Sequence, residues 1–206
     1  MQSPETILWG VDMQRDFMLP DGKLYVPSAE TLLPNIQRLT DVAREGRAFF
    51  VSHGCFHTSN DPEFATFPPH CVTGTPGSEF IPEALVKGHR QIPNNPDATL
   101  PKDLLSVPQI ILEKQTLDIF ESRHAGELVD RLSRTAQFIV FGVVTEYCVQ
   151  FAARGLLQRG RRVAVIEDAI QTLNRQAGER SIMELRSLGA SFLTTNEQLA
   201  KLRVTA

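Results

Sequence analysis

Residues 138–149 read Phe-Ile-Val-Phe-Gly-Val-Val-Thr-Glu-Tyr-Cys-Val, and this stretch decides the fold. The apolar, β-branched run from Phe138 to Val144 is typical of a buried strand. A short polar elbow follows, and a helix-like pattern runs from Glu146 to Arg159 with Cys148 in its first turn. A thiol in that place lies at the positive end of the helix dipole, beside backbone N–H groups that can stabilise a thiolate or an oxyanion. The plain alternative is a small buried apolar residue at a strand–helix junction.

The same strand–helix order continues on both sides of this stretch. Short apolar strands are predicted at 7–11, 48–52, 109–112, 138–144, 163–166 and 191–193. Helices are predicted from Ser28, an expected N-cap, to Gly46, from Ser122 to Leu132, at 146–159, at 176–188, and briefly at the C-terminus. Short apolar strands that alternate with helices predict an α/β fold. We therefore expect a three-layer αβα arrangement with a mostly parallel, doubly wound, Rossmann-like sheet of about six strands.

Composition excludes several classes of protein. The 206 residues are 42% hydrophobic and 22% charged, and they predict a single domain over 1–206. A net charge of −3 gives no reason to expect a nucleic-acid or membrane partner, and no apolar run approaches the roughly 20 residues that span a bilayer. Residues 1–5 do not resemble a secretory signal, and three cysteines argue against a disulfide framework. We expect a cytoplasmic protein.

One segment interrupts the α/β order. Residues 53–108 hold nine of the 13 prolines and most of the histidines, and we expect a long functional loop or lid there. In open parallel sheets, ligands bind beyond the carboxyl ends of the strands. Asp12, the start of this segment, Lys114 and the elbow before Cys148 all follow predicted strands. The sequence therefore predicts that they meet at one rim of the sheet.

Three of these residues suit amide hydrolysis by a thiol. A lysine cation beside Cys148 is expected to depress the thiol pKa, and a carboxylate can move the thiol proton to a leaving amine. Taken singly, Asp12 at a strand end can merely fix a turn, and Lys114 can be a solvated surface residue. The shared position at the rim favours the catalytic interpretation.

Three motifs resemble those of the isochorismatase-like cysteine hydrolases. They are Val11-Asp12-Met13-Gln14-Arg15-Asp16-Phe17, Glu113-Lys114, and the elbow from Gly142 to Val149. The resemblance extends through nearly the whole chain. Within that group, Phe67-Pro68-Pro69-His70-Cys71-Val72-Thr73-Gly74-Thr75-Pro76-Gly77 is similar to a segment typical of nicotinamidases.

This resemblance implies roles for individual residues. Asp12, Lys114 and Cys148 match the catalytic triad of the family. A cis peptide bond is implied between Val143 and Val144, with the N–H groups of Val144 and Cys148 forming an oxyanion hole. Phe17, Phe67 and Phe120 match positions that wall a ring pocket, although ordinary core packing explains Phe120 equally well.

Nicotinamidases also hold a divalent metal through an Asp-x-His pair and further ligands. In this chain the pair reads Cys55-Phe56-His57, so a cysteine replaces the aspartate. His57, Glu63 and His70 match the other ligand positions, and such a set suits Zn, with Fe or Mn as alternatives. Cys55 either serves as a soft ligand or marks a weakened or absent site. His53 and His89 match no ligand position, and no nucleotide cofactor is expected.

The leading hypothesis is a nicotinamidase-like amidohydrolase that acts on a small-molecule amide through a Cys148 thioester, a step of NAD salvage. A second reading is a metal-free relative of the same fold, such as an isochorismatase or a hydrolase of carbamoyl or acyclic amides. The Cys55 replacement is the best argument for it. A third is a non-catalytic protein with a reactive thiol, against which the Asp12–Lys114 pair argues. A homo-oligomer is compatible with the sequence, which does not decide the oligomeric state.

Overall fold

The protein, described over residues 5–204 by a computed structural model, is built on one sheet whose seven strands are all parallel. The strands are β1 (Thr6–Val11), β2 (Phe49–Cys55), β3 (Arg90–Ile92), β4 (Gln109–Lys114), β5 (Gln137–Val143), β6 (Arg162–Gln171) and β7 (Ser191–Leu193). Their order in the sheet is β3-β4-β2-β1-β5-β6-β7. The prediction of an α/β fold with a doubly wound parallel sheet is confirmed, with seven strands where about six were expected.

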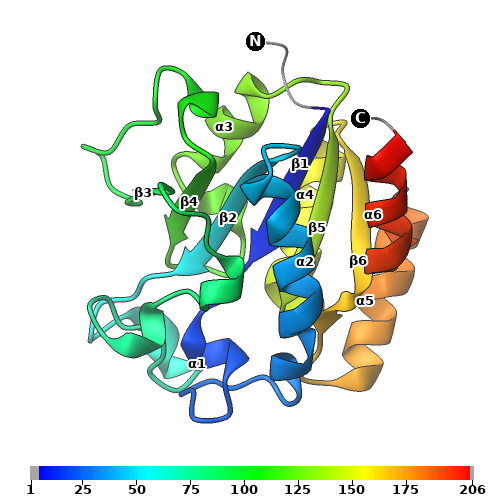
Figure 1. The fold of residues 1–206 in the computed structure, drawn as a ribbon. Helices are drawn as coiled ribbons and strands as arrows, with labels where there is room; N and C mark the ends of the chain where they lie inside the picture. Colours follow the sequence, from blue (N-terminus) through cyan, green and yellow to red (C-terminus); the bar gives the residue numbers. More distant parts are fainter. Residues whose placement is uncertain (1–4, 205–206) are drawn as a thin grey trace.

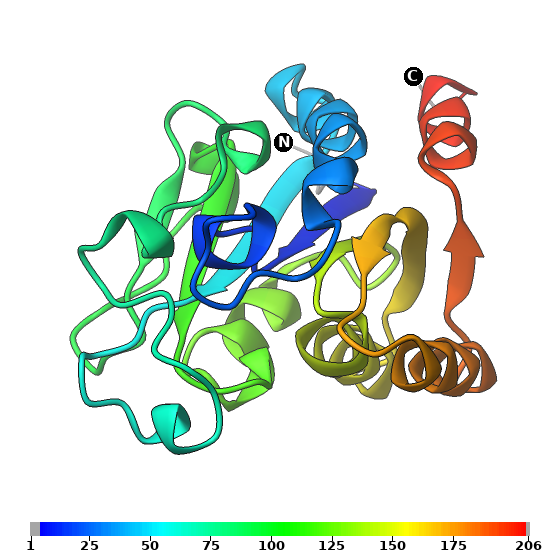
Figure 2. The ribbon, with the colours of Figure 1, turned by 90° about the horizontal axis from the view of Figure 1, so that it is seen from below.

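Helices cover both faces of this sheet, as Figures 1 and 2 show. They are α1 (Arg15–Met18), α2 (Leu33–Arg44), α3 (Ala125–Arg131), α4 (Gln150–Gln158), α5 (Arg175–Ser187) and α6 (Thr195–Val204). Helices α2 and α6 lie on one face, and α3, α4 and α5 lie on the other (Figure 2). The fold therefore has three layers, as predicted.

Side chains of β1 alternate between two apolar cores, one on each face. Leu8 packs with residues of α2 and α6, whereas Ile7, Trp9 and Val11 pack with residues of α3, α4 and α5. A strand places successive side chains on opposite faces, so a central strand must be apolar throughout when both faces are covered. This explains why the strands read as short continuous apolar runs.

The register of the strands aligns their carboxyl ends at one edge. Val11 of β1 is paired with His53 of β2 on one side and with Gly142 of β5 on the other. Cys55 at the end of β2 is paired with Lys114 at the end of β4. These strand ends therefore meet at one rim, as expected. The rim includes the switch point of the sheet, where β1 lies between β2 on one side and β5 on the other.

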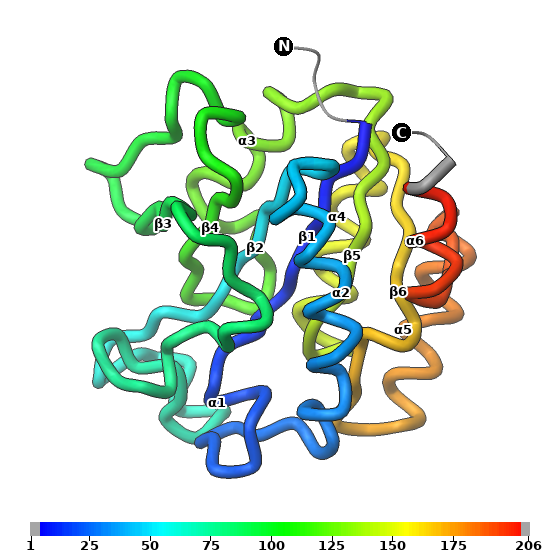
Figure 3. The backbone as a smooth tube through the Cα atoms, viewed as in Figure 1, coloured from blue at the N-terminus to red at the C-terminus, as the bar shows by residue number. Residues whose placement is uncertain are grey.

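The segment 53–108 is not entirely loop. Figure 3 shows it turning beside α1 at the carboxyl edge and then returning along the outside of the sheet. There it forms β3, which pairs with β4 at Arg90↔Ile110, Gln91↔Ile111 and Ile92↔Leu112. The sequence missed β3 because it has three residues, two of them exposed and polar, and so carries no apolar run.

Three predicted helix starts are wrong by a few residues. Ser28 has a φ of +66° and makes no capping bond, and α2 begins at Leu33 after a 3₁₀ turn, Ala29–Leu32. Helix α3 begins at Ala125 rather than at Ser122. Helix α4 begins at Gln150, because Tyr147 (φ −125°, ψ −106°) interrupts the irregular turn Thr145–Val149 that precedes it. Cys148 therefore lies in this turn, before the regular helix.

Within residues 5–204, every helix is too short or too polar to cross a membrane. The expectation that the first residues lack a secretory signal concerns residues 1–5, of which 1–4 lie outside the described part.

Candidate active site

Three ionisable side chains from separate strands meet at the floor of a pocket at the carboxyl edge. The ammonium nitrogen of Lys114 lies 3.0 Å from Asp12 Oδ2 and 3.6 Å from Cys148 Sγ. None of the three residues is more than 5% exposed. The structure thus brings together the three residues that the sequence selected as a triad.

Each of the three is placed by the end of a strand. Asp12 directly follows β1, has a φ of +48°, and donates its backbone N–H to the carbonyl of His53 at 2.9 Å. Lys114 is the last residue of β4 and is fully buried. Cys148 lies in the turn after β5, just beyond a cis peptide bond between Val143 and Val144, as the family resemblance implied.

Electrostatics keep Asp12 and Lys114 charged. Burial raises the pKa of Asp12, but the neighbouring Lys114 ammonium and then His53 lower it well below its usual range. Burial lowers the pKa of Lys114, but Asp12 and the two nearby cysteines raise it well above its usual value. The two residues therefore form a buried ion pair.

The thiol of Cys148 behaves differently from the expectation based on sequence. Burial raises the pKa of Cys148 most, the Asp12 carboxylate raises it further, and Lys114 offsets only part of the rise. Lys114 lowers the pKa of Cys148 as expected, but burial and Asp12 outweigh this effect, and the pKa consequently lies well above its usual value. The resting group is a neutral thiol beside an ion pair.

The pocket above these groups has an empty volume of about 360 Å³ and is mostly apolar. It is lined by Asp12, Phe17, Leu24, Cys55, Glu63, Phe67, His70, Leu117, Val143, Val144, Tyr147, Cys148 and Leu173. This volume includes space that is open to solvent. The apolar lining suits a small molecule with an apolar body and a few polar groups.

Two of the three predicted aromatic wall residues line this pocket, and the third does not. Phe17 packs edge-on against His70, and Phe67 packs edge-on against Tyr147. Phe120 instead stacks on Trp9, with the Arg159 guanidinium 3.9 Å above its ring centre. Expecting Phe120 in the pocket wall was wrong, because a 3₁₀ turn places it against the core under α4.

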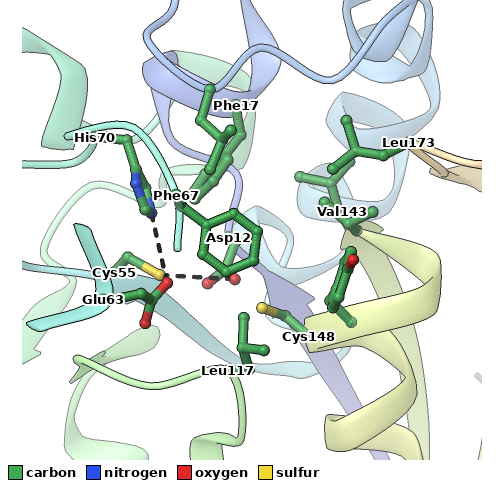
Figure 4. A pocket seen from close by; sticks show the side chains of 13 residues that line it. Asp12, Phe17, Cys55, Glu63, Phe67, His70, Leu117, Val143, Cys148 and Leu173 are labelled. Carbon is green, nitrogen blue, oxygen red and sulfur yellow. Dashed lines mark hydrogen bonds and ion pairs between the residues drawn. The ribbon is translucent and has the colours of Figure 1, made fainter. Parts of the chain in front are cut away.

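A group of metal-ligand side chains lies on one side of the pocket (Figure 4). One ligand atom each of Cys55, His57 and His70 can be chosen so that all lie within 4.8 Å of one another. Glu63, also expected as a ligand, has its Oε1 3.9 Å from His70 Nε2. All four candidate ligands therefore lie on this side of the pocket, and Cys55 belongs to the group of three whose ligand atoms are close together.

Neighbouring groups orient the two histidine rings. His57 Nδ1 lies 3.1 Å from Asp61 Oδ2, although both of its ring nitrogens are buried without a hydrogen bond in residues 5–204. His70 Nδ1 lies 2.8 Å from the carbonyl oxygen of Pro68, which leaves its Nε2 for another partner. Histidines that bind metals are commonly oriented in this way, with a carboxylate or a carbonyl on the other ring nitrogen.

Cys55 touches both groups of residues. Its sulfur accepts from Lys114 Nζ at 2.9 Å and lies 4.0 Å from Asp12 Oδ2. Burial, followed by the Asp12 carboxylate, raises the pKa of Cys55 to about 12. Without a bound cation, Cys55 is therefore a neutral thiol.

Two further site residues escaped the sequence analysis. Gln14 is fully buried; its Oε1 accepts from the N–H of Cys55 at 2.7 Å, and its Nε2 donates to the carbonyls of Cys55 (2.6 Å) and Ser78 (2.9 Å). His53, treated as structural or surface, is fully buried with Nδ1 3.4 Å from Asp12 Oδ1. Gln14 lies two residues after Asp12 inside the first motif, and this position was the only signal of its role.

Comparison with known proteins gives the family of the chain. The Isochorismatase domain model matches residues 6–95 and 87–197. The nicotinamidase of Escherichia coli K12 is 26% identical over 220 residues, covering 93% of this chain and 95% of its own. Nicotinamidase 3 of Arabidopsis thaliana is 25% identical over 198 residues, covering 93% and 85%. The crystal structure of the pyrazinamidase of Pyrococcus horikoshii in complex with zinc is 28% identical, with a TM-score of 0.74 over 93% of this chain and 99% of that one.

A three-layer αβα fold with a thiol, a carboxylate and an ammonium buried at one rim, together with these relatives, indicates a cysteine hydrolase. The chain belongs to the isochorismatase family. Within that family it resembles the nicotinamidases.

Proposed function

We propose that the protein hydrolyses nicotinamide, or a similar ring carboxamide, to the acid and ammonia. The observation that carries the proposal is the contact of Lys114 with both Asp12 (3.0 Å) and Cys148 (3.6 Å) at the buried end of a small apolar pocket. A nucleophile, a proton acceptor and a cation held within contact distance are the groups that acyl transfer by a thiol requires.

The first half of the reaction forms a thioester. Cys148 Sγ attacks the amide carbon while its proton passes to the Asp12 carboxylate. Because the thiol is neutral at rest and a free thiolate is disfavoured, proton transfer accompanies formation of the C–S bond. The backbone N–H groups of Val144 and Cys148 are the proposed donors to the oxyanion. Asp12 then returns the proton to the leaving nitrogen, and ammonia departs.

The second half returns the enzyme to its resting state. Asp12, again a carboxylate, accepts a proton from water as the water oxygen attacks the thioester carbon. Cys148 leaves and takes up that proton, so one water is consumed for each acid and ammonia released. Lys114 holds the Asp12 carboxylate in place and stabilises negative charge on the Cys148 sulfur as it leaves.

The donors beside the pocket fit a divalent metal, with Zn as the proposed ion. We propose that Cys55, His57 and His70 hold it, with Glu63 as a further or water-bridged ligand. The fit rests on the buried, unpartnered Nε2 of His57 and on the neighbours that orient both rings. When bound, the ion would fix the ring nitrogen of the substrate and so orient the carboxamide toward Cys148.

Phe17 and Phe67 are the proposed ring-binding side chains. Both line the same pocket as Cys55, His70 and Cys148. Figure 4 shows both of them above the floor formed by Asp12 and Cys148. A flat ring between these side chains gains dispersion and apolar burial without needing a charged partner.

Ammonia release from nicotinamide by the purified protein tests the proposal. We expect turnover that Cys148→Ala lowers by at least about 10³-fold, and that Asp12→Asn lowers comparably. Cys71→Ala is the matched control, because Cys71 is equally buried but does not line the pocket. Hydrolysis of carbamoyl or acyclic amides without any action on nicotinamide would overturn the proposed substrate and favour the metal-free alternative.

The metal proposal has a test that does not depend on activity. Protein loaded with Co(II) should show the near-ultraviolet charge-transfer absorption of a thiolate–cobalt bond. Cys55→Asp should still bind Co(II) but lack that absorption, and Cys71→Ser should retain it. Cobalt binding without charge-transfer absorption in the unaltered protein would exclude Cys55 as a ligand.

A further inference from the structure

Glu146, two residues before Cys148, binds the backbone of a distant loop. Its Oε1 accepts from the N–H groups of Leu173 (3.0 Å) and Asn174 (2.7 Å), and its Oε2 accepts from Thr172 Oγ1 at 2.6 Å. One carboxylate thus holds three consecutive residues between β6 and α5. Charge-assisted hydrogen bonds of this kind are stronger and more directional than those between neutral groups.

The neighbouring residue reinforces this connection. Thr145 Oγ1 donates to the carbonyl of Gln171 at 2.8 Å. Thr145 and Glu146 belong to the same irregular turn as Cys148. Four side-chain hydrogen bonds therefore connect the turn that carries the candidate nucleophile to residues 171–174.

The loop contributes Leu173 to the pocket. This side chain lines the cavity yet is 40% exposed, one of the few large apolar side chains in residues 5–202 to be so exposed. Figure 4 shows Leu173 beside Val143, on the side opposite Cys55 and His70. A molecule bound in this cavity would therefore contact the Leu173 side chain and cover part of its exposed apolar surface.

We propose that Leu173 determines the size of the ring that the pocket admits, and that Glu146 is the positioning residue that holds Leu173 there. The inference rests on the proposed function for the identity of the substrate, but not for the loop contact itself. It assigns to the enzyme a flat ring carboxamide with no substituent on the edge that faces away from Cys55 and His70. Substituents on that edge meet Leu173.

Kinetics with nicotinamide and the set of ring-methylated nicotinamides test the size limit. For Leu173→Ala, KM for nicotinamide should rise about 3- to 10-fold with little change in kcat, because apolar contact is lost. At least one methylated isomer should gain about 10-fold or more in kcat/KM relative to nicotinamide, which is the usual worth of one methyl group in a fitted pocket. Leu188→Ala is the matched control, because Leu188 is 47% exposed and does not line the pocket.

The role of Glu146 is tested by the same ratio, which is kcat/KM for the methylated isomer divided by kcat/KM for nicotinamide. Glu146→Ala should shift the ratio in the direction of Leu173→Ala, and Glu146→Gln, which keeps one acceptor oxygen, should restore part of it. The double variant, with Glu146→Ala and Leu173→Ala, should not raise this ratio above that of Leu173→Ala alone, because both changes remove the same wall of the pocket. Glu184→Ala is the control. Glu184 in α5 accepts a hydrogen bond from Gln150 in α4 but does not bind residues 172–174.

Two readouts remain if nicotinamide proves not to be a substrate. Alkylation of Cys148, followed by peptide mass spectrometry, compares iodoacetamide with its bulkier N-benzyl derivative. Leu173→Ala and Glu146→Ala should each raise the relative rate of the bulky reagent several-fold. Hydrogen exchange of the peptide holding Leu173 and Asn174 should speed up in Glu146→Ala and less in Glu146→Gln. An unchanged reagent ratio in Leu173→Ala, or unchanged exchange in Glu146→Ala, overturns the inference whatever the substrate.

Discussion

Replacing Lys114 by methionine is the sharpest test of the electrostatics of the site. The methionine side chain has a similar length and no charge, so it removes the ammonium while filling most of the same space. In the native protein that ammonium lies 3.0 Å from Asp12 Oδ2 and 2.9 Å from Cys55 Sγ, fully buried. The variant therefore leaves the Asp12 carboxylate buried without a cation.

The expected loss of stability is about 3–5 kcal/mol at neutral pH, the usual cost of breaking a buried ion pair from one side. Asp12 is 1% exposed, so solvent screening does not reduce this figure. A typical domain has about 5–15 kcal/mol of stability in total, so the variant should still fold but be much weakened. Lys87→Met, at an exposed lysine, should change stability by less than about 0.5 kcal/mol.

The loss should depend on pH with a definite sign. The folded-state pKa of Asp12 is depressed, so its contribution is present above the unfolded value of about 4 and is lost as pH falls through the folded value. The folded-state pKa of Lys114 is raised, so its contribution is present below about pH 10 and is lost as pH rises through the folded value. In Lys114→Met, burial still raises the pKa of Asp12 while only His53 and Cys148 lower it, so this pKa lies above its value in the native protein. The difference between the two proteins should therefore be largest near neutrality and already smaller at about pH 4, because Asp12 takes up a proton at higher pH in the variant than in the native protein.

Urea denaturation monitored by Trp9 fluorescence measures these differences. Trp9 is the single tryptophan and is fully buried beside His53, 6.1 Å between ring centres. The double variant with Asp12→Asn should recover part of the stability lost in Lys114→Met, because no buried charge is then left unpaired. A loss below about 1 kcal/mol, or one that is equal at pH 4 and pH 8, would refute the reasoning.

Three further outcomes follow from the same structure. Gln14→Leu should lose about 3 kcal/mol in urea denaturation because it leaves buried backbone groups unpaired, whereas Gln91→Leu, at an exposed site, should lose little. Gly142→Ala should cost about 3 kcal/mol or more in thermal unfolding, because φ is +117° and a Cβ would overlap a β1 carbonyl. Gly46→Ala, with φ of +72° and open space around it, should cost only about 1 kcal/mol. Added Zn should raise the Tm in proportion to the logarithm of its concentration, and His57→Ala should remove that shift.

Much of the fold could be predicted from local pattern. Apolar runs located the strands because a sheet covered on both faces requires apolar side chains at every position. Strand β3 was missed because two of its three residues are exposed and polar, so its pairing with β4 is a tertiary event. The start of α4 was misplaced because Tyr147 leaves the helical region inside a stretch whose composition favours helix.

The site was predictable to the extent that its residues follow strands. Asp12, Lys114 and Cys148 were selected because parallel strands place their carboxyl ends together, and the structure brings them into contact. His53 was set aside because a histidine inside a long segment carries no local sign of burial. The sequence left Phe120 open between the pocket wall and the core, because an aromatic residue two positions after Asp118 can face either one.

The sequence by itself determined the order of strands and helices along the chain, β3 excepted, and the set of chemical groups at the carboxyl edge. Both follow from periodicity and from the rule that parallel strands end together. Only the tertiary structure decided that Cys148 rests as a neutral thiol, and that Glu146 carries Leu173 to the pocket mouth. Burial and Coulomb interaction depend on every atom within a few ångströms, and those atoms come from segments far apart in the chain.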